Sequence, residues 1–220
     1  PTPHFRQSLM VESETGSVLD LLRRATKPAA IVVGAAAVIG IGMYFWRSNQ
    51  QAEALRAEKS YFQAQTSLAT GNRALAESDL QKLIQRSPGT PAAVQASALL
   101  ATLRYEDGKH AEGVTLVQRA LEKAPDHMKP GLHALLAAGY EDQKKLVEAA
   151  AEFRKAAEST EFPLERQKYL ADAARALTTA GRTEEARKLW AELAEDELSP
   201  TAGEARVRLG ELSAKPAGRS

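Results

Sequence analysis

The chain of 220 residues contains no cysteine, which excludes a disulfide framework, a thiolate zinc site and a cysteine nucleophile. Aromatic residues make up only 5% of the chain, and the formal net charge is +1. Without a strongly basic face, the sequence lacks the electrostatic footprint of a nucleic-acid-binding protein. We therefore expect no nucleic-acid partner.

Charge is absent from one long run, residues 29–46. As a helix this run would be roughly 27 Å long, close to the roughly 30 Å of a bilayer's hydrocarbon core. It ends in Tyr44, Phe45 and Trp46, and such rings suit the headgroup level. We predict a single transmembrane helix at 29–46 in contact with the lipid bilayer. The alternatives are a buried helix of a soluble domain and a cleaved signal peptide, although a signal peptide has a shorter apolar core and a small-residue cleavage site.

Basic residues flank this run unequally. Arg23, Arg24 and Lys27 precede it, whereas Arg47 alone follows directly. Lys and Arg favour the cytoplasmic side of a membrane. We therefore predict a cytoplasmic N-terminal tail, residues 1–28, and a large domain on the other side. In a bacterium with two membranes, this is the inner membrane with the domain in the periplasm.

Small residues line two faces of the predicted span. Ala30, Gly34 and Ala37 share one face, and Ala36 and Gly40 form a second small pair. Small residues let helices approach closely in lipid. This predicts packing against a helix of a membrane protein complex. The alternative is that Ala and Gly are simply tolerated there.

From residue 50 onward the sequence repeats with a period of 36 to 37 residues. Four units begin near residues 57, 94, 130 and 167. The eighth position is always alanine: Ala64, Ala101, Ala137 and Ala174. The twentieth is small: Ala76, Gly113, Ala149 and Ala186. The twenty-fourth is large and apolar: Leu80, Val117, Phe153 and Trp190. Small residues let two helices of a hairpin approach, and the large residue fills the space against the next hairpin.

The fifteenth position is glycine in three units, Gly71, Gly108 and Gly181, and Lys144 in the third. Glycine there can end a helix in the left-handed conformation. A single hairpin cannot bury its own apolar face, so neighbours must stack. We predict an all-α solenoid of about four helical hairpins plus a capping helix over residues 50–213, followed by a flexible C-terminus, residues 214–220.

Residues that could carry chemistry form no recognisable set. His127 and His133 have no acidic partner at metal-ligand spacing, and the glycines stand singly rather than in a phosphate-binding loop. No Ser-His-Asp combination rises above background. We therefore predict a non-enzymatic protein with no catalytic residue, metal, cofactor or small-molecule substrate.

The segments 108–125, 148–159 and 181–193 resemble the second helix of the tetratricopeptide repeat. The period is longer than the family's 34 residues, and Ser60, Ser97, His133 and Leu170 replace the usual aromatic at the fourth position. The resemblance implies a concave groove, mostly small and neutral, that suits an apolar or helical segment or stays empty. The implied groove lacks the Lys/Asn/Arg cluster with which the family binds a C-terminal carboxylate. The implied lining is Tyr61, Gln65, Ala98, Thr102, Tyr105, Ala134, Ala138, Glu141, Ala171 and Arg175.

The stretch 42–50, which leads into 51–65, resembles the span exit and first helix of the YfgM-like family of ancillary inner-membrane proteins. That family is associated with the Sec translocon and a membrane-anchored periplasmic chaperone. The resemblance implies a non-enzymatic adaptor that binds protein partners at the periplasmic face. The alternative is an accessory subunit that stabilises a larger energy-transducing complex, respiratory or photosynthetic, through its span and repeats.

Overall fold

The computed structural model describes the backbone of residues 12–196 and 199–214, and the side chains of residues 38–196 and 199–214. Within these ranges every regular element is a helix. The chain forms two compact units, Pro1–Ala52 and Glu53–Ser220. Helix α1, Glu12–Ala69, contributes to both of them.

In the first unit, α1 exposes its large apolar side chains. The side chains of seven residues between positions 38 and 46 are 49–71% exposed; they are Val38, Ile39, Ile41, Met43, Tyr44, Phe45 and Trp46. Across the part of the chain that the structure describes, no helix is both long and apolar enough to cross a membrane. The predicted span begins at residue 29, and the side chains of residues 29–37 lie outside the described part. The span therefore stays a prediction.

The predicted small-residue faces fall mostly in the same region. Ala30, Gly34, Ala36 and Ala37 lie outside the residues with described side chains. Gly40 is described, and a methyl group added there would meet nothing within 4 Å. Packing of these faces against another membrane helix also stays a prediction.

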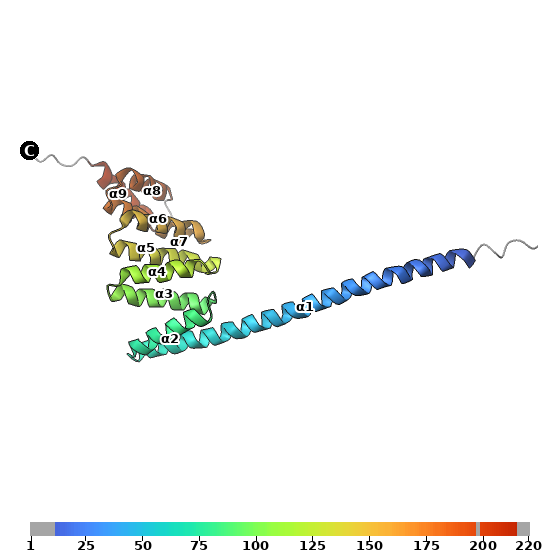
Figure 1. The fold of residues 1–220 in the computed structure, drawn as a ribbon. Coiled ribbons are helices and arrows are strands. Elements are labelled where there is room, and N and C mark those ends of the chain that lie inside the picture. Colours follow the sequence, from blue (N-terminus) through green and yellow to red (C-terminus); the bar gives the residue numbers. More distant parts are fainter. Residues whose placement is uncertain (1–11, 197–198, 215–220) are drawn as a thin grey trace, which may run out of the picture. The chain divides into compact units, whose positions relative to one another are not determined.

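The second unit confirms the predicted stack of helical hairpins and its cap. Each helix from α2 to α9 contacts the next one along the chain, and Figure 1 shows α3, α4 and α5 layered in that order with α6 to α9 beyond them. The hairpins pair the end of α1 with α2, α3 with α4, α5 with α6, and α7 with α8. Their bounds are α2 Arg73–Arg86, α3 Pro91–Glu106, α4 His110–Leu121, α5 Lys129–Asp142, α6 Leu146–Ser159, α7 Pro163–Thr179, α8 Thr183–Glu195 and α9 Ala202–Ser213, with a 3-10 turn η1 at Asp126–Met128.

The repeated positions form the core. All four alanines at the eighth position are 0% exposed, and so are the three alanines at the twentieth. The large residues at the twenty-fourth position, Leu80, Val117, Phe153 and Trp190, are buried in the clusters between hairpins. Burial of these side chains stabilises the stack, because a hairpin in isolation would leave them in water.

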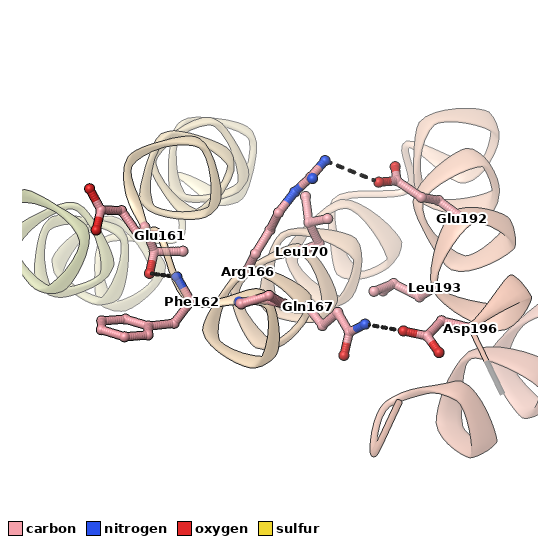
Figure 2. Close-up of a pocket in the computed structure, with 10 residues that line it drawn as sticks. Glu161, Phe162, Arg166, Gln167, Leu170, Glu192, Leu193 and Asp196 are labelled. Atoms are coloured by element: carbon pink, nitrogen blue, oxygen red, sulfur yellow. Dashed lines mark hydrogen bonds and ion pairs between the residues drawn. The ribbon is translucent and has the colours of Figure 1, made fainter. Parts of the chain in front are cut away.

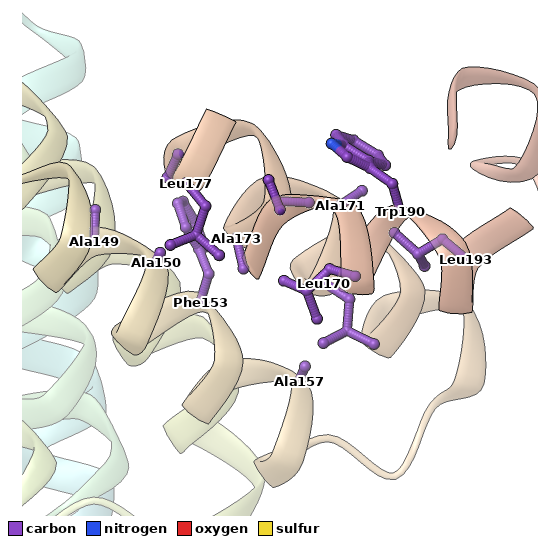
Figure 3. Close-up of a cluster of buried hydrophobic side chains, with 14 of the residues drawn as sticks. Ala149, Ala150, Phe153, Ala157, Leu170, Ala171, Ala173, Leu177, Trp190 and Leu193 are labelled. Atoms are coloured by element: carbon purple, nitrogen blue, oxygen red, sulfur yellow. The ribbon is translucent and has the colours of Figure 1, made fainter. Parts of the chain in front are cut away.

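Trp190 joins the fourth hairpin to the cap. Figure 3 shows it in the cluster with Leu170 and Leu193, and Ala205 of α9 belongs to the same cluster. Trp190 is fully buried, and its indole N–H donates to the Thr178 hydroxyl at 3.3 Å. The indole therefore buries its ring and also satisfies its polar atom.

The turn inside each hairpin adopts the left-handed conformation that the glycine pattern predicts. Gly71, Gly108 and Gly181 have φ of 73° to 80°, and Lys144 takes the equivalent place with φ 61°. In the second hairpin the N–H of Gly108 donates to the Tyr105 carbonyl at 2.9 Å. The N–H of the next residue reaches back across the last helical turn to an earlier carbonyl in all four hairpins. This pair of bonds satisfies carbonyls that the helix end would leave open.

Candidate interaction surfaces

The predicted groove lining is partly core. Tyr61, Ala98 and Ala134 are partly buried and pack against the clusters between hairpins. The Thr102 hydroxyl donates to a carbonyl of its own helix. Gln65 is exposed and Ala138 is half-buried.

Ala171 does not line an open wall. It is fully buried, so the sequence prediction is wrong at this position. The physical reason is that Ala171 lies within the hydrophobic cluster to which α5, α6, α7, α8 and α9 all contribute.

Tyr105 acts as a wedge between hairpins. Its ring contacts the backbone positions of Gly113 in α4 and Gly139 in α5, where an added methyl group would lie 2.3 Å from ring or hydroxyl atoms. Burial raises the pKa of Tyr105 to about 12, and the charge of Asp142 adds to this shift. Its hydroxyl is buried without a hydrogen-bond partner. Tyr105 therefore fills space that two glycines leave open.

Charged groups occupy the far end of the predicted lining. Arg175 of α7 contacts Asp172, and its Nε donates to Glu204 of α9 at 2.8 Å. Burial raises the pKa of Asp172. It also raises the pKa of Glu141, with Asp172 and Asp142 adding to the shift. This part of the lining is charged, whereas the sequence suggested a mostly neutral wall.

A partly buried histidine–carboxylate pair lies inside the third hairpin. Nδ1 of His133 in α5 lies 2.7 Å from Oε2 of Glu152 in α6, and Lys155 donates to Oε1 of Glu152 at 2.7 Å. Burial opposes ionisation of Glu152, but the hydrogen bonds with His133 and Lys155 outweigh it and lower the pKa. Among the described residues there is no group of three or more His, Asp or Glu side chains that could hold a metal ion.

Two arginines brace the first two hairpins at their turn ends. Arg104 is 9% exposed, and its guanidinium contacts Glu77 at 2.8 Å and Glu112 at 3.2 Å. Arg73 contacts Glu77 at 3.1 Å and Asp107 at 2.7 Å. The hydrogen bond from Arg104 lowers the pKa of Glu77, and the bond from Arg73 adds to this. Because the charges are paired with one another, we assign this network a structural role.

Four hollows lie along a different edge of the repeat domain. We call it the inter-hairpin edge: the side where the second helix of each hairpin ends and the first helix of the next begins. The hollows have volumes of about 380, 390, 440 and 480 Å³. Cavities of this size are in the range that accommodates ligand or partner side chains.

Figure 2 shows the hollow between α7 and α8. Leu170 and Leu193 form its apolar floor. Arg166 contacts Glu192 across one rim at 3.5 Å, and Gln167 donates to Asp196 across the other at 2.6 Å. These polar pairs bridge the two helices, so the hollow has a defined width.

The loop between α6 and α7 forms the outer wall of this hollow. Phe162 of this loop and Leu164, the second residue of α7, are each 65% exposed. In Figure 2 the ring of Phe162 points away from Leu170 and Leu193. The repeating positions of the sequence carry no signal for this loop, because Phe162 falls outside them.

The fold and these surfaces define a repeat solenoid, a class of protein that presents extended surfaces for binding. The sequence profile of the tetratricopeptide repeat-like domain family matches residues 24–213. The chain belongs to this family, whose repeat fold is typically a non-catalytic scaffold that mediates protein–protein interactions. A comparison with curated proteins gives no match.

Solved structures share the fold. The TPR-like repeats of a Podosopora anserina protein assigned as a kinesin light chain align with a TM-score of 0.55 and 16% identity, over 72% of this chain and 86% of that one. A tetratricopeptide repeat protein from Parabacteroides merdae aligns with a TM-score of 0.56 and 18% identity, over 71% of this chain and 59% of that one. At this identity the likeness concerns the fold alone.

Proposed function

We propose that the protein is a membrane-anchored scaffold whose repeat domain binds other proteins. The observation that carries the membrane part is the exposure of seven large apolar side chains of α1 between residues 38 and 46. So much apolar surface on one helix is costly in water, and a bilayer or a neighbouring membrane helix would cover it. The charge-free run at 29–46 and its basic flanks support the same proposal.

Alkaline carbonate extraction of membranes from cells that express the full chain tests the anchor. The wild-type chain is expected in the membrane pellet. Replacing Ile39 and Ile41 with lysine should release it, because a charge in a span costs about 2.5–3.5 kcal/mol per residue on insertion scales. Leu55→Lys is the matched control, because Leu55 is also exposed, at 68%, but lies outside the run. Release of the wild-type chain, or equal release of the control, would contradict the proposal.

We further propose a cytoplasmic N-terminal tail and a periplasmic repeat domain, supported by Arg23, Arg24 and Lys27 before the run. Protease added to spheroplasts should then digest the repeat domain and spare the tail. Protection of the repeat domain until lysis would reverse the orientation.

For the partner, the stretch 42–65 supports a complex that assists the Sec translocon and periplasmic chaperones. The small residues Gly34 and Gly40 in the run suit the alternative equally well, a subunit that stabilises an energy-transducing complex. Purification in mild detergent separates the two. Sec components in the eluate favour the first, and redox or pigment-binding subunits favour the second.

A further inference from the structure

We infer that the inter-hairpin edge beside α7 docks a basic amphipathic segment of a partner protein, with an apolar side chain of that segment packed against Phe162. The inference rests on the proposed scaffold function and names the chemistry of its partner. The site differs from the groove lined by the first helices, because it lies at the connections between consecutive hairpins.

The backbone that carries Phe162 is held in place. The Thr160 hydroxyl accepts the N–H of Phe162 at 3.2 Å and donates to Glu165 at 2.8 Å. Pro163 begins α7, and the carbonyl of Phe162 accepts the N–H of Arg166 at 3.0 Å. An exposed aromatic on a fixed backbone loses little freedom on binding, and aromatic side chains are common anchors of interfaces.

Phe162 separates two hollows. It lines the 380 Å³ hollow between α7 and α8 and also the 440 Å³ hollow formed with η1 and the start of α5. A helix that crosses the ring could place side chains four residues apart on either side of it, because such side chains share one face. Leu164, two residues further along the chain, is also exposed.

The two hollows beside Phe162 are acidic. Their lining includes one arginine, one histidine and five carboxylates: Asp126, Glu161, Glu165, Glu192 and Asp196. The arginine is Arg166, which contacts Glu192. Lys129 stands nearby and is paired with Asp126 at 2.6 Å.

The other half of the same edge has the opposite charge. The hollows beside the first two hairpins are lined by five basic residues, Arg56, Lys82, Arg86, Arg119 and Lys123, and by two acidic ones, Asp79 and Glu122. The exposed Phe162 and Leu164 thus lie in the acidic half. Charge complementarity across an interface selects partners and steers their approach. A segment that combines apolar anchors with lysine or arginine fits the acidic half and is repelled by the basic half.

The test uses the full chain in nanodiscs of neutral lipid and a fluorescent helical peptide with leucines four residues apart and flanking lysines. Fluorescence anisotropy should report binding that weakens as salt rises. Phe162→Ser should weaken it at least about tenfold, the loss typical of an interface anchor. Phe162→Leu should keep most of the affinity because it retains an apolar side chain.

Matched controls distinguish binding at this site from nonspecific binding. Val207→Ser removes an apolar residue of similar exposure, 60%, from α9 and should leave binding unchanged. Glu161→Lys should weaken binding, whereas Glu148→Lys, at the other end of α6, should not. A peptide with glutamate in place of lysine should not bind, and empty nanodiscs give the background.

Equal binding by the Phe162→Ser chain with unchanged circular dichroism would overturn the inference. So would equal losses in the Val207→Ser chain. Light scattering adds a third test, because self-association that Phe162→Ser abolishes would assign the site to a second copy of the chain. Carbonate extraction is scored separately, so a chain that binds the peptide but leaves the membrane refutes only the anchor, and a chain retained in the membrane without peptide binding refutes only this inference.

Discussion

Lys144→Gly should stabilise the protein, because Lys144 occupies a position that glycine fills in the other three hairpins. Its φ of 61° places a residue with a side chain in the left-handed region. That conformation costs roughly 1–2 kcal/mol for an L-residue. Glycine removes this cost but gains freedom in the unfolded chain, which offsets about 0.4–1 kcal/mol. The net expected gain is about 0.5–1 kcal/mol, or about 1–4 °C in Tm for a domain of this size.

The reverse change tests the same reasoning. Gly108 has φ 73°, and a methyl group added there would meet nothing within 4 Å. Gly108→Ala should therefore lose about 0.5–1 kcal/mol through the backbone alone. Gly131, in helix α5, also faces open space but has ordinary helical φ. Gly131→Ala should gain up to about 1 kcal/mol from helix propensity.

Thermal melts of the full chain, followed by circular dichroism in the same nanodiscs, measure all three variants. Lys144→Gly and Gly131→Ala should raise the Tm, and Gly108→Ala should lower it. A lower Tm for Lys144→Gly, or shifts of the two alanine variants in the same direction, would contradict the assigned backbone cost.

Four further substitutions test the core and the His133–Glu152 pair. Trp190→Ala should cost roughly 3–5 kcal/mol, and a loss below about 1 kcal/mol in denaturant melts would contradict its assigned place between hairpin and cap. Gly139→Ala should cost about 1–3 kcal/mol of stability by overpacking against Tyr105. Tyr105→Phe should be neutral or stabilising, because the buried Tyr105 hydroxyl has no hydrogen-bond partner. A large loss of stability in Tyr105→Phe would show that the hydroxyl does make a hydrogen bond. Because the folded-state pKa of Glu152 is lowered, its stabilisation is present above the unfolded value of about 4.3 and lost as pH falls through the folded value. The Tm gap between the wild-type chain and Glu152→Gln should therefore narrow below about pH 4, and a gap that stays constant from pH 7 to 3 would refute the stabilising role of the ionised Glu152 carboxylate.

The repeat architecture was predictable because its determinants are local and recur. Ala64 and its three equivalents are all fully buried, since close helix approach demands a small residue at that register. The turn position was equally readable, and Lys144 adopts the positive φ of the glycines it replaces. Each such position is set by one hairpin and its immediate neighbour.

The remaining features depend on how separate elements meet. His133 and Glu152 are 19 residues apart, and the angle between α5 and α6 decides that they touch. Ala171 was assigned to an open wall by the family's pattern, whereas it lies inside the hydrophobic cluster to which α5 to α9 all contribute. Phe162 lies in a connection outside the repeat, so periodicity carried no information about its exposure.

Purification of the full chain from its native membranes in mild detergent, with quantitative mass spectrometry, tests the central claim most directly. A membrane-anchored scaffold should retain protein partners through contacts in the bilayer and outside it. Gly34→Leu in the predicted span and a flexible Gly/Ser linker after Gln50 should each reduce the recovered partner, because each weakens one contact or lowers the effective concentration of the other. Recovery of the chain without any enriched partner would contradict the scaffold function. If both variants recover as much partner as the wild-type chain does, the partner is not held by two contacts.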